Sequence, residues 1–303
     1  MKKGMYMRLK TKGLIAIFIL VIVLSACSSK NEVVISGKPW TEQYILPYIL
    51  GGVIEENTDY DVKYEEGLGE VAILTPALDK GEIDLYVEYT GTGLKDVLEE
   101  ETEPGESPDS VYDRVKKGYD EEFDVKWLEP LGFENAYTLT YAPDSGYEAE
   151  TISELAEISQ KNDMVFGAPH PFYERVGEGY DDLVEAFPFD FSDTKSIDPN
   201  IMYDAVEKGD VDLVPGFTTD SRIEKFDLVT TEDDKDFFPM YDAVPIIRKE
   251  ALEDMPELED AINKLAGEIS EEEMLKMNAR VDIDEEKPED VANDFLVEKG
   301  LIE

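Results

Sequence analysis

Two aromatic residues end predicted strands at equivalent places in the chain, and their rings are suited to binding a cation. Tyr89 closes the apolar run of "GEIDLYVEYTGTGL" (81–94) and is followed by small residues and hydroxyls. Phe217 closes "VDLVPGFTTD" (211–220) in the same way. Aromatic faces attract cations through the ring quadrupole and also tolerate apolar groups. We therefore expect a binding site where these two strands end.

The two strands belong to a pattern that occurs twice in the sequence. "ALDKGEIDLYVEY" (77–89) aligns with "AVEKGDVDLVPGF" (205–217) at a constant offset of 128 residues. In each copy a helix ends at Lys-Gly, where glycine suits the left-handed position after a helix, and a strand follows. Gly37 and Gly167 end earlier strands of the two copies. The repeat predicts two lobes of similar build whose strand ends face one cleft.

The remainder of the chain alternates apolar strands with helical segments, which is typical of an α/β fold. Strands are expected at 32–37, 60–67 and 82–89, with helices at 41–55 and 71–80 between them. An exposed, charged helix is expected at 109–122, followed by a helix at 151–160 and a strand at 163–169 in the second lobe.

Two proline-containing connectors each lead into a tyrosine. "LEPLGFENA" (128–136) precedes Tyr137, and "DDKDFFPM" (233–240) precedes Tyr241. We interpret these connectors as two crossings between the lobes. Lobe I would then comprise residues 27–134 and 241–303, lobe II would comprise 135–240, and the hinge would lie in the connectors.

The N-terminal segment has the features of a secretion signal. Five basic residues precede an unbroken apolar run at 14–24, which is shorter than the ~20 apolar residues of a transmembrane helix. The following "LSAC" (24–27) resembles a lipobox, which implies that residues 1–26 are removed and that Cys27, the only cysteine, carries a lipid. An uncleaved anchor is the alternative. Both place the rest of the protein outside the cytoplasm, tethered to a membrane.

The chain is strongly acidic, with 72 Asp and Glu residues against 28 Lys and Arg, and a formal net charge of −44. Because residues 1–26 contain five basic and no acidic side chains, residues 27–303 carry −49. This charge excludes nucleic acid as a partner in practice. We interpret the acidic residues as a solvated surface suited to concentrated salt.

Several motifs together resemble the substrate-binding lipoproteins of ABC transporters for glycine betaine, carnitine and choline. They occur in order from residue 33 to residue 302, and they are "SGKPWTEQYIL", "GEIDLYVEYTGTGL", "WLEPLGFENAY", "FGAPHPFYERV", "VDLVPGFTTDSRI", "DDKDFFPMYDAVPIIRKE" and "VANDFLVEKGLI". The resemblance implies a two-lobed type II periplasmic-binding-protein fold. It also implies a small quaternary-ammonium ligand and, as partners, an ABC permease with its ATPase subunits.

Members of this family hold a trimethylammonium group in an aromatic cage and bind the ligand's carboxylate with basic and hydroxyl groups. Transferred to this sequence, the resemblance implies a cage of Tyr89, Tyr137, Phe217 and Tyr241. It implies a carboxylate site of Lys38, Thr92 and Arg175. Such a cage is chemically reasonable, because a trimethylammonium group has no N–H and hydrogen bonds cannot recognise its charge.

The sequence departs from the family pattern at two aromatic positions and leaves other roles open. Several members have tyrosine where Phe217 stands, so a hydrogen bond from that position is lost, and phenylalanine is common where Trp40 stands. We expect Trp40 to be a core or lobe-surface ring. Lys38 and Arg175 are alternatively a solvated lysine and half of an ordinary ion pair, and Thr92 alternatively caps the following helix.

Other functional classes have less support in the sequence. A secreted lipoprotein hydrolase with a nucleophilic triad would need more than the single His170, and no GxSxG motif is present. A hydrolase with paired carboxylates, or a receptor for a different small cation or zwitterion, remains an alternative. An adhesion or scaffold lipoprotein would have no cleft. We expect no enzyme activity and no cofactor. We also expect no metal, since the sequence has no EF-hand-type calcium loop.

Overall fold

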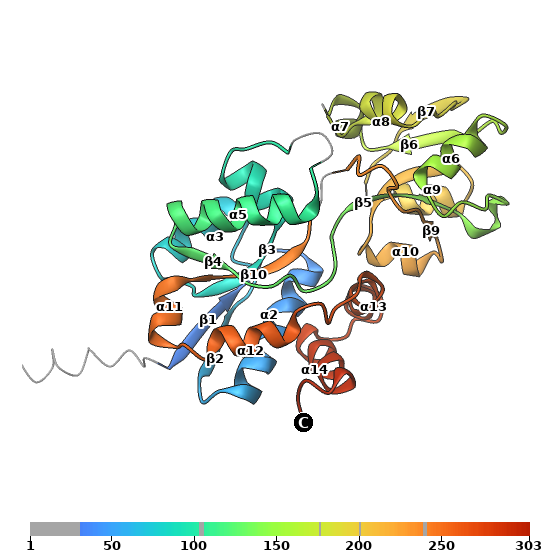
Figure 1. Cartoon of the computed structure of the whole chain (residues 1–303). Helices are drawn as coiled ribbons and strands as arrows, with labels where there is room; N and C mark the ends of the chain where they lie inside the picture. The colour runs from blue at the N-terminus through green and yellow to red at the C-terminus, as the bar shows by residue number, and fades with distance from the viewer. Residues whose placement is uncertain (1–30, 103–105, 176, 200, 239–240) are drawn as a thin grey trace, which may run out of the picture.

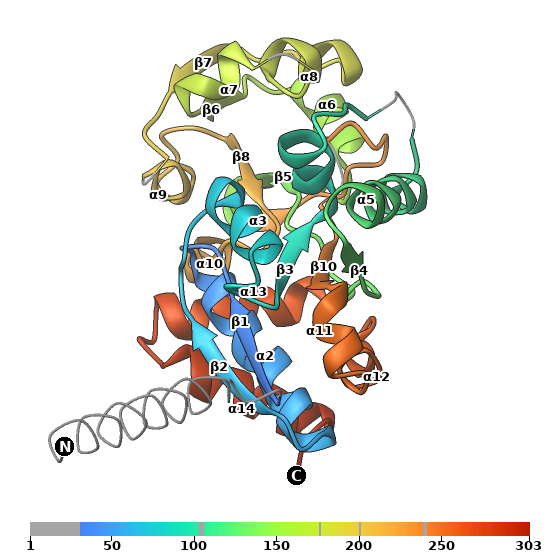
Figure 2. The ribbon, with the colours of Figure 1, turned by 90° about the vertical axis from the view of Figure 1, so that its left-hand side faces the viewer.

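The computed structural model describes residues 31–303 apart from 103–105, 176, 200 and 239–240. The predicted signal segment and Cys27 lie outside the described residues. Two five-stranded sheets, each covered by helices, form two lobes (Figures 1 and 2). The predicted α/β, two-lobed fold is therefore confirmed.

The sheet of the first lobe has the order β2-β1-β3-β10-β4. Its strands are β1 (Glu32–Ser36), β2 (Asp61–Glu65), β3 (Leu85–Tyr89), β4 (Val125–Trp127) and β10 (Ala243–Arg248). β1 pairs in parallel with β2 and β3, whereas β10 runs antiparallel to β3 and β4. The chain thus returns from the second lobe to complete the sheet of the first.

Helices cover both faces of this first sheet. On one face lie α2 (Thr41–Asn57), α12 (Leu258–Ile262), α13 (Glu271–Asp282) and α14 (Pro288–Lys299), and on the other α3 (Val71–Asp79) and α5 (Pro108–Glu122). Leu85, Val87 and Tyr89 of β3 belong to the core beneath α2, while Tyr86 belongs to the core beneath α5. This alternation is what a strand buried on both faces requires. Two short helices, α4 (Thr90–Thr92) and α11 (Lys249–Asp254), follow strand ends.

The sheet of the second lobe has the order β7-β6-β8-β5-β9. Its strands are β5 (Tyr137–Tyr141), β6 (Val165–Ala168), β7 (Asp193–Ser196), β8 (Leu213–Phe217) and β9 (Val229–Thr230). Its helices are α6 (Ile152–Ser159), α7 (His170–Glu174), α8 (Tyr180–Ala186), α9 (Met202–Glu207) and α10 (Ser221–Lys225). β5 runs antiparallel to β8, just as β10 runs antiparallel to β3.

The sequence repeat corresponds to a structural repeat. Gly81 and Gly209 both have a left-handed backbone, with φ of 67° and 71°. Asp84 and Asp212 stand at the same place in the two copies. The carboxylate of Asp84 accepts a hydrogen bond of 2.8 Å from the backbone N–H of Val34 in β1, and that of Asp212 accepts one of 2.8 Å from the backbone N–H of Val165 in β6. The two copies therefore deliver β3 and β8 with the same local geometry.

The two connectors between the sheets run side by side. Glu134 and Asp242 form an antiparallel bridge, and the backbone N–H of Asn135 donates to the carbonyl of Tyr241 at 3.2 Å. The chain passes between the two sheets only here in the part that the structure describes. Among the described residues, no helix is long and apolar enough to cross a membrane.

Candidate functional site

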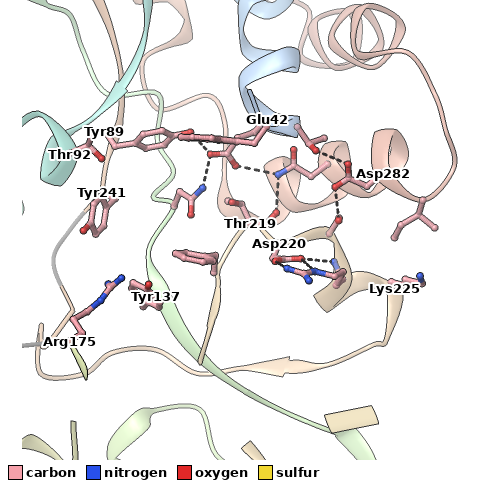
Figure 3. Close-up of a pocket in the computed structure, with 18 residues that line it drawn as sticks. Glu42, Tyr89, Thr92, Tyr137, Arg175, Thr219, Asp220, Lys225, Tyr241 and Asp282 are labelled. Carbon is pink, nitrogen blue, oxygen red and sulfur yellow. Dashed lines mark hydrogen bonds and ion pairs between the residues drawn. The ribbon is translucent and has the colours of Figure 1, made fainter. Parts of the chain in front are cut away.

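A cavity of about 810 Å³ lies between the two lobes. The N-terminus of α2, the ends of β3 and β8, the start of β5, helix α10 and the last turn of α13 all contribute to its wall. In Figure 3, Glu42 and Asp282 occupy one end of the cavity, and Arg175, Tyr137 and Tyr241 occupy the other. Segments that are far apart in the sequence therefore line the same cavity.

All four rings predicted to form a cage line this cavity. They are Tyr89, Tyr137, Phe217 and Tyr241. Tyr89 and Phe217 are the last residues of β3 and β8, and Tyr137 is the first residue of β5, opposite Phe217 in the antiparallel pair. Their arrangement follows from the repeat, because the carboxyl ends of β3 and β8 open on the same cleft.

On the lobe II side the aromatic rings form a packed group. The ring centroids of Tyr137 and Phe217 are 4.5 Å apart, and Tyr137 stacks on Phe238 at 5.2 Å. Phe217 is 38% exposed, which leaves much of its ring open to the cleft. A guanidinium already interacts with this group, since Cζ of Arg175 lies 5.2 Å above the Tyr137 ring. The group thus provides ring faces that accept a cation.

On the lobe I side Tyr89 is held firmly in place. Its ring stacks on Trp40 with centroids 6.3 Å apart, and its hydroxyl donates to Glu42 while accepting from Gln43 Nε2 at 3.0 Å. Burial, and then the negative charge of Glu42, raise the pKa of Tyr89 well above its usual value. The phenol therefore stays protonated at any physiological pH. Burial also raises the pKa of Tyr241 above its usual range.

Two of the three residues predicted for a carboxylate site line the cavity. Thr92 ends α4, and its side chain makes no capping bond to the π-helix Gly93–Val97 that follows. Arg175 follows α7, and its guanidinium lies 3.5 Å from Glu178 Oε2. Oε1 of Glu178 lies 3.3 Å from Lys95 Nζ, so this carboxylate links Arg175 to the first lobe. Arg175 is thereby kept near the cleft with most of its donors unused by Glu178.

Lys38, the third predicted carboxylate ligand, does not line the cavity. It is 1% exposed and pairs with Glu88, which is 0% exposed. Its Nζ lies 5.0 Å from the centroid of the Tyr89 ring. Glu88 also accepts from the backbone N–H of Tyr89 at 2.8 Å and from the Tyr86 hydroxyl at 2.9 Å. The lysine and its partner therefore support Tyr89 from within the lobe.

Sequence reasoning missed several residues of the cavity wall. Trp40, expected in the core or on the lobe surface, lines the cavity. The polar end also contains Glu42, Asn135, Thr219, Asn278 and Asp282. The position of Trp40 and Glu42 just after Lys38, at the start of a predicted helix, was an available signal. Asn278 and Asp282 belong to α13, and nothing in their local sequence marks them.

Helix α13 also ties the two lobes together beside the cavity. Asp282 Oδ1 accepts from the Thr41 hydroxyl at 2.6 Å, and Oδ2 accepts from the Ser221 hydroxyl at 2.7 Å. The amide of Asn278 donates to the carbonyl of Thr219 at 2.8 Å. Thr219 and Ser221 flank the start of α10 in the second lobe.

Among the described residues, no group of three or more His, Cys, Asp or Glu side chains is placed to hold a metal ion.

Known proteins with similar sequences are solute-binding proteins. The carnitine transport binding protein OpuCC of Listeria monocytogenes is 33% identical over 307 residues, which cover 96% of this chain and 98% of that protein. The ergothioneine transport permease/ergothioneine binding protein EgtU of Helicobacter pylori is 35% identical over 301 residues, covering 95% of this chain and 52% of that protein. The chain thus spans about half the length of EgtU.

A similar fold has been solved for a related protein. The crystal structure described as a glycine betaine/carnitine/choline ABC transporter superposes with a TM-score of 0.82 at 31% identity, covering 89% of this chain and all of that one. Residues 31–298 match the family described as the substrate binding domain of the ABC-type glycine betaine transport system. These are substrate-binding proteins and not enzymes, so the hydrolase alternative has no support. The chain belongs to this family.

Proposed function

We propose that this protein captures a trimethylammonium carboxylate in the cleft between its lobes and delivers it to an ABC permease. The observation that carries the proposal is that the four predicted cage rings and Arg175 all line a single cavity. The names of related proteins agree, because glycine betaine, carnitine and ergothioneine are all trimethylammonium carboxylates.

The rings supply the site for the ammonium group. A trimethylammonium group offers no N–H to a hydrogen-bond acceptor, so charge and apolar methyl groups are all that a site can recognise. Tyr89 and Tyr241 approach from the first lobe, and Tyr137 and Phe217 from the second. At about 0.5–2 kcal/mol for each ring face, the four together contribute about 2–8 kcal/mol before the cost of association.

Arg175 and Thr92 supply the site for the carboxylate. Charge-assisted hydrogen bonds contribute about 1.5–3 kcal/mol each, and micromolar binding requires about 8 kcal/mol in total. Rings and arginine together reach that value, whereas neither does so comfortably alone. Lys38 is not a ligand in this scheme, and its buried ion pair with Glu88 contributes to the stability of the first lobe.

Closure of the lobes would carry the signal to the permease. We assign residues 27–134 and 241–303 to one lobe and 135–240 to the other, with bending at the paired connectors around Glu134 and Asp242. A ligand that contacts both Tyr89 and Phe217 binds the closed arrangement of the lobes more tightly than the open one. This difference in affinity sets how far the ligand shifts the equilibrium toward closure. The ATP that drives transport is bound by other subunits.

Calorimetric titration with an N-methylation series tests the proposal. Glycine, N-methylglycine, N,N-dimethylglycine and glycine betaine share a carboxylate and differ only in the number of N–H groups replaced by methyl. Affinity should rise steeply with methylation, and glycine itself should bind too weakly to measure. Equal affinity along the series would refute an aromatic cation site. Absence of binding by glycine betaine, carnitine and choline alike would refute the proposed ligand class.

We also propose that the protein is held outside the cytoplasm by a lipid on Cys27. The apolar run at 14–24 followed by "LSAC" supports this anchor. A lipid anchor keeps the receptor close to the permease at high effective concentration.

A further inference from the structure

Glu42 is a nearly buried carboxylate at the end of the cavity opposite Arg175 (Figure 3). It is 2% exposed and lies in the first turn of α2. Its Oε1 accepts from the Tyr89 hydroxyl and from Asn135 Nδ2 at 2.8 Å. Its Oε2 accepts only a long bond of 3.3 Å, from Asn278 Nδ2. One oxygen of this carboxylate therefore retains accepting capacity.

In the part of the chain that the structure describes, no Lys, Arg or His side chain forms an ion pair with Glu42. Of the basic residues in the cavity wall, Arg175 lies at the opposite end beside Glu178, Arg222 pairs with Asp220, and Lys225 is not paired with Glu42 in the described residues. A buried carboxylate without a counter-charge is costly unless hydrogen bonds satisfy it. The donors that reach Glu42, one hydroxyl and two side-chain amides, are all neutral, so a donor on a ligand can add to them.

Asn278 adds a second acceptor beside this carboxylate. Its side chain is 4% exposed and lines the cavity. Nδ2 donates both to Glu42 and to the carbonyl of Thr219 at 2.8 Å, and because both partners are acceptors the orientation of the amide is fixed. Among the described residues, no donor reaches its Oδ1, which is buried. Unmatched buried acceptors are uncommon in proteins and call for a partner.

The other two carboxylates at this end already have partners within the protein. Both oxygens of Asp282 accept hydroxyl hydrogen bonds, from Thr41 and from Ser221. Both oxygens of Asp220 bind Arg222. Glu42 Oε2 and Asn278 Oδ1 are therefore two buried acceptors at this end with capacity left for a ligand.

We propose that Glu42 and Asn278 form a second subsite, which accepts a hydrogen bond from an O–H or N–H group of the ligand. The preferred ligand class is then a trimethylammonium carboxylate that carries an additional donor. This inference rests on the proposed function. The cavity of about 810 Å³ has room for such a ligand, since glycine betaine fills on the order of 200 Å³ when judged against the ~30 Å³ of a water molecule.

Matched ligands that differ only in the donor test the subsite. Carnitine is compared with deoxycarnitine, which lacks its hydroxyl, and ergothioneine with its ring-N-methylated derivative, each by calorimetric titration. For at least one pair, the donor-bearing ligand should bind the wild-type protein about 10-fold or more tightly, because a hydrogen bond to a buried carboxylate discriminates strongly. Glu42→Gln should reduce that ratio to about 3-fold or less.

Glu272→Gln is the matched control, since it makes the same carboxylate-to-amide change on helix α13 at an exposed side chain that pairs with Lys276 and does not line the cavity. It should leave the ratio unchanged. Asn278→Ala, checked for folding by thermal unfolding, should lower the ratio as Glu42→Gln does and provides the test if that variant fails to fold.

The subsite is refuted if neither pair shows discrimination in the wild type, if Glu42→Gln and Asn278→Ala both keep it, or if Glu272→Gln removes it equally. These outcomes leave the proposed function intact, provided that glycine betaine binds. If no trimethylammonium carboxylate binds the wild type, the proposed function itself fails.

Discussion

Replacing Lys38 with methionine should destabilise the protein strongly while changing ligand affinity little. The ammonium of Lys38 is buried against Glu88, and both side chains are at most 2% exposed. Lys38→Met leaves the Glu88 carboxylate with two hydrogen bonds, from Tyr86 and Tyr89, but without a counter-charge. Removing one partner of such a buried pair costs about 3–5 kcal/mol.

Thermal unfolding followed by circular dichroism measures this effect. For a chain of this size, about 3–5 kcal/mol corresponds to a Tm lower by roughly 6–20 °C. Lys38→Met combined with Glu88→Gln should recover at least half of the loss, because the uncompensated charge is gone. Lys63→Met is the matched control. Its ion pair with Glu65 is solvent-exposed, so its Tm should stay within about 2 °C of the wild type.

Ligand titration separates the structural role of Lys38 from the role first expected of it. Because Lys38 does not line the cavity, the folded Lys38→Met variant should bind glycine betaine within about 3-fold of the wild type. A stable variant that loses glycine betaine selectively, and keeps choline, would contradict the buried ion pair and restore Lys38 as a direct ligand.

Three further predictions concern pH, salt and location. Burial, and then the charges of Asp242 and Glu271, raise the pKa of Glu134 from 4.5 to about 7. Between these two pH values the folded protein keeps a proton on Glu134 that the unfolded chain releases. The free energy of unfolding should therefore fall as the pH rises from about 4.5 to 7. Glu134→Gln should flatten that fall and raise the Tm above pH 7, and an unchanged Tm–pH slope would count against it. With −49 on residues 27–303, Tm at neutral pH should rise between low and molar salt as self-repulsion is screened, and a flat or falling Tm would contradict this. Cys27→Ser should yield precursor or released protein in cell fractionation, whereas tight membrane retention of a processed chain would exclude the lipid anchor.

The sequence repeat predicted the positions of two of the four rings, Tyr89 and Phe217, because periodicity and local signals determine them. Tyr137 and Tyr241 followed from the connectors and the family resemblance. The Lys-Gly helix ends at 80–81 and 208–209, followed by apolar strands, place Tyr89 and Phe217 at strand ends in both lobes. Helix α2 was predicted at 41–55 and extends over Thr41–Asn57, and α6 was predicted at 151–160 and spans Ile152–Ser159, with Thr151 as its N-cap. These features depend on residues close in sequence.

The polar part of the site depends on residues far apart in sequence, and the sequence pattern could not reveal it. The residue type and the motif around Lys38 suggested a ligand-binding residue. Its side chain instead forms a buried ion pair with Glu88, fifty positions away in the sequence. Asn278 reaches Glu42 across 236 positions, through the packing of α13 against α2. Side-chain partners at such separations are set by the packing of the helices and not by any local periodicity.

Titration of glycine betaine and choline into the wild type, Tyr137→Ala and Arg175→Ala tests the two ends of the proposed site most directly. Tyr137→Ala should weaken both ligands, by at least about 1–2 kcal/mol, because both carry the ammonium group that the ring would contact. Arg175→Ala should cost glycine betaine about 2–5 kcal/mol and spare choline, which has no carboxylate. Equal losses of both ligands in Arg175→Ala, or full affinity for both in Tyr137→Ala, would contradict the proposed mode of binding.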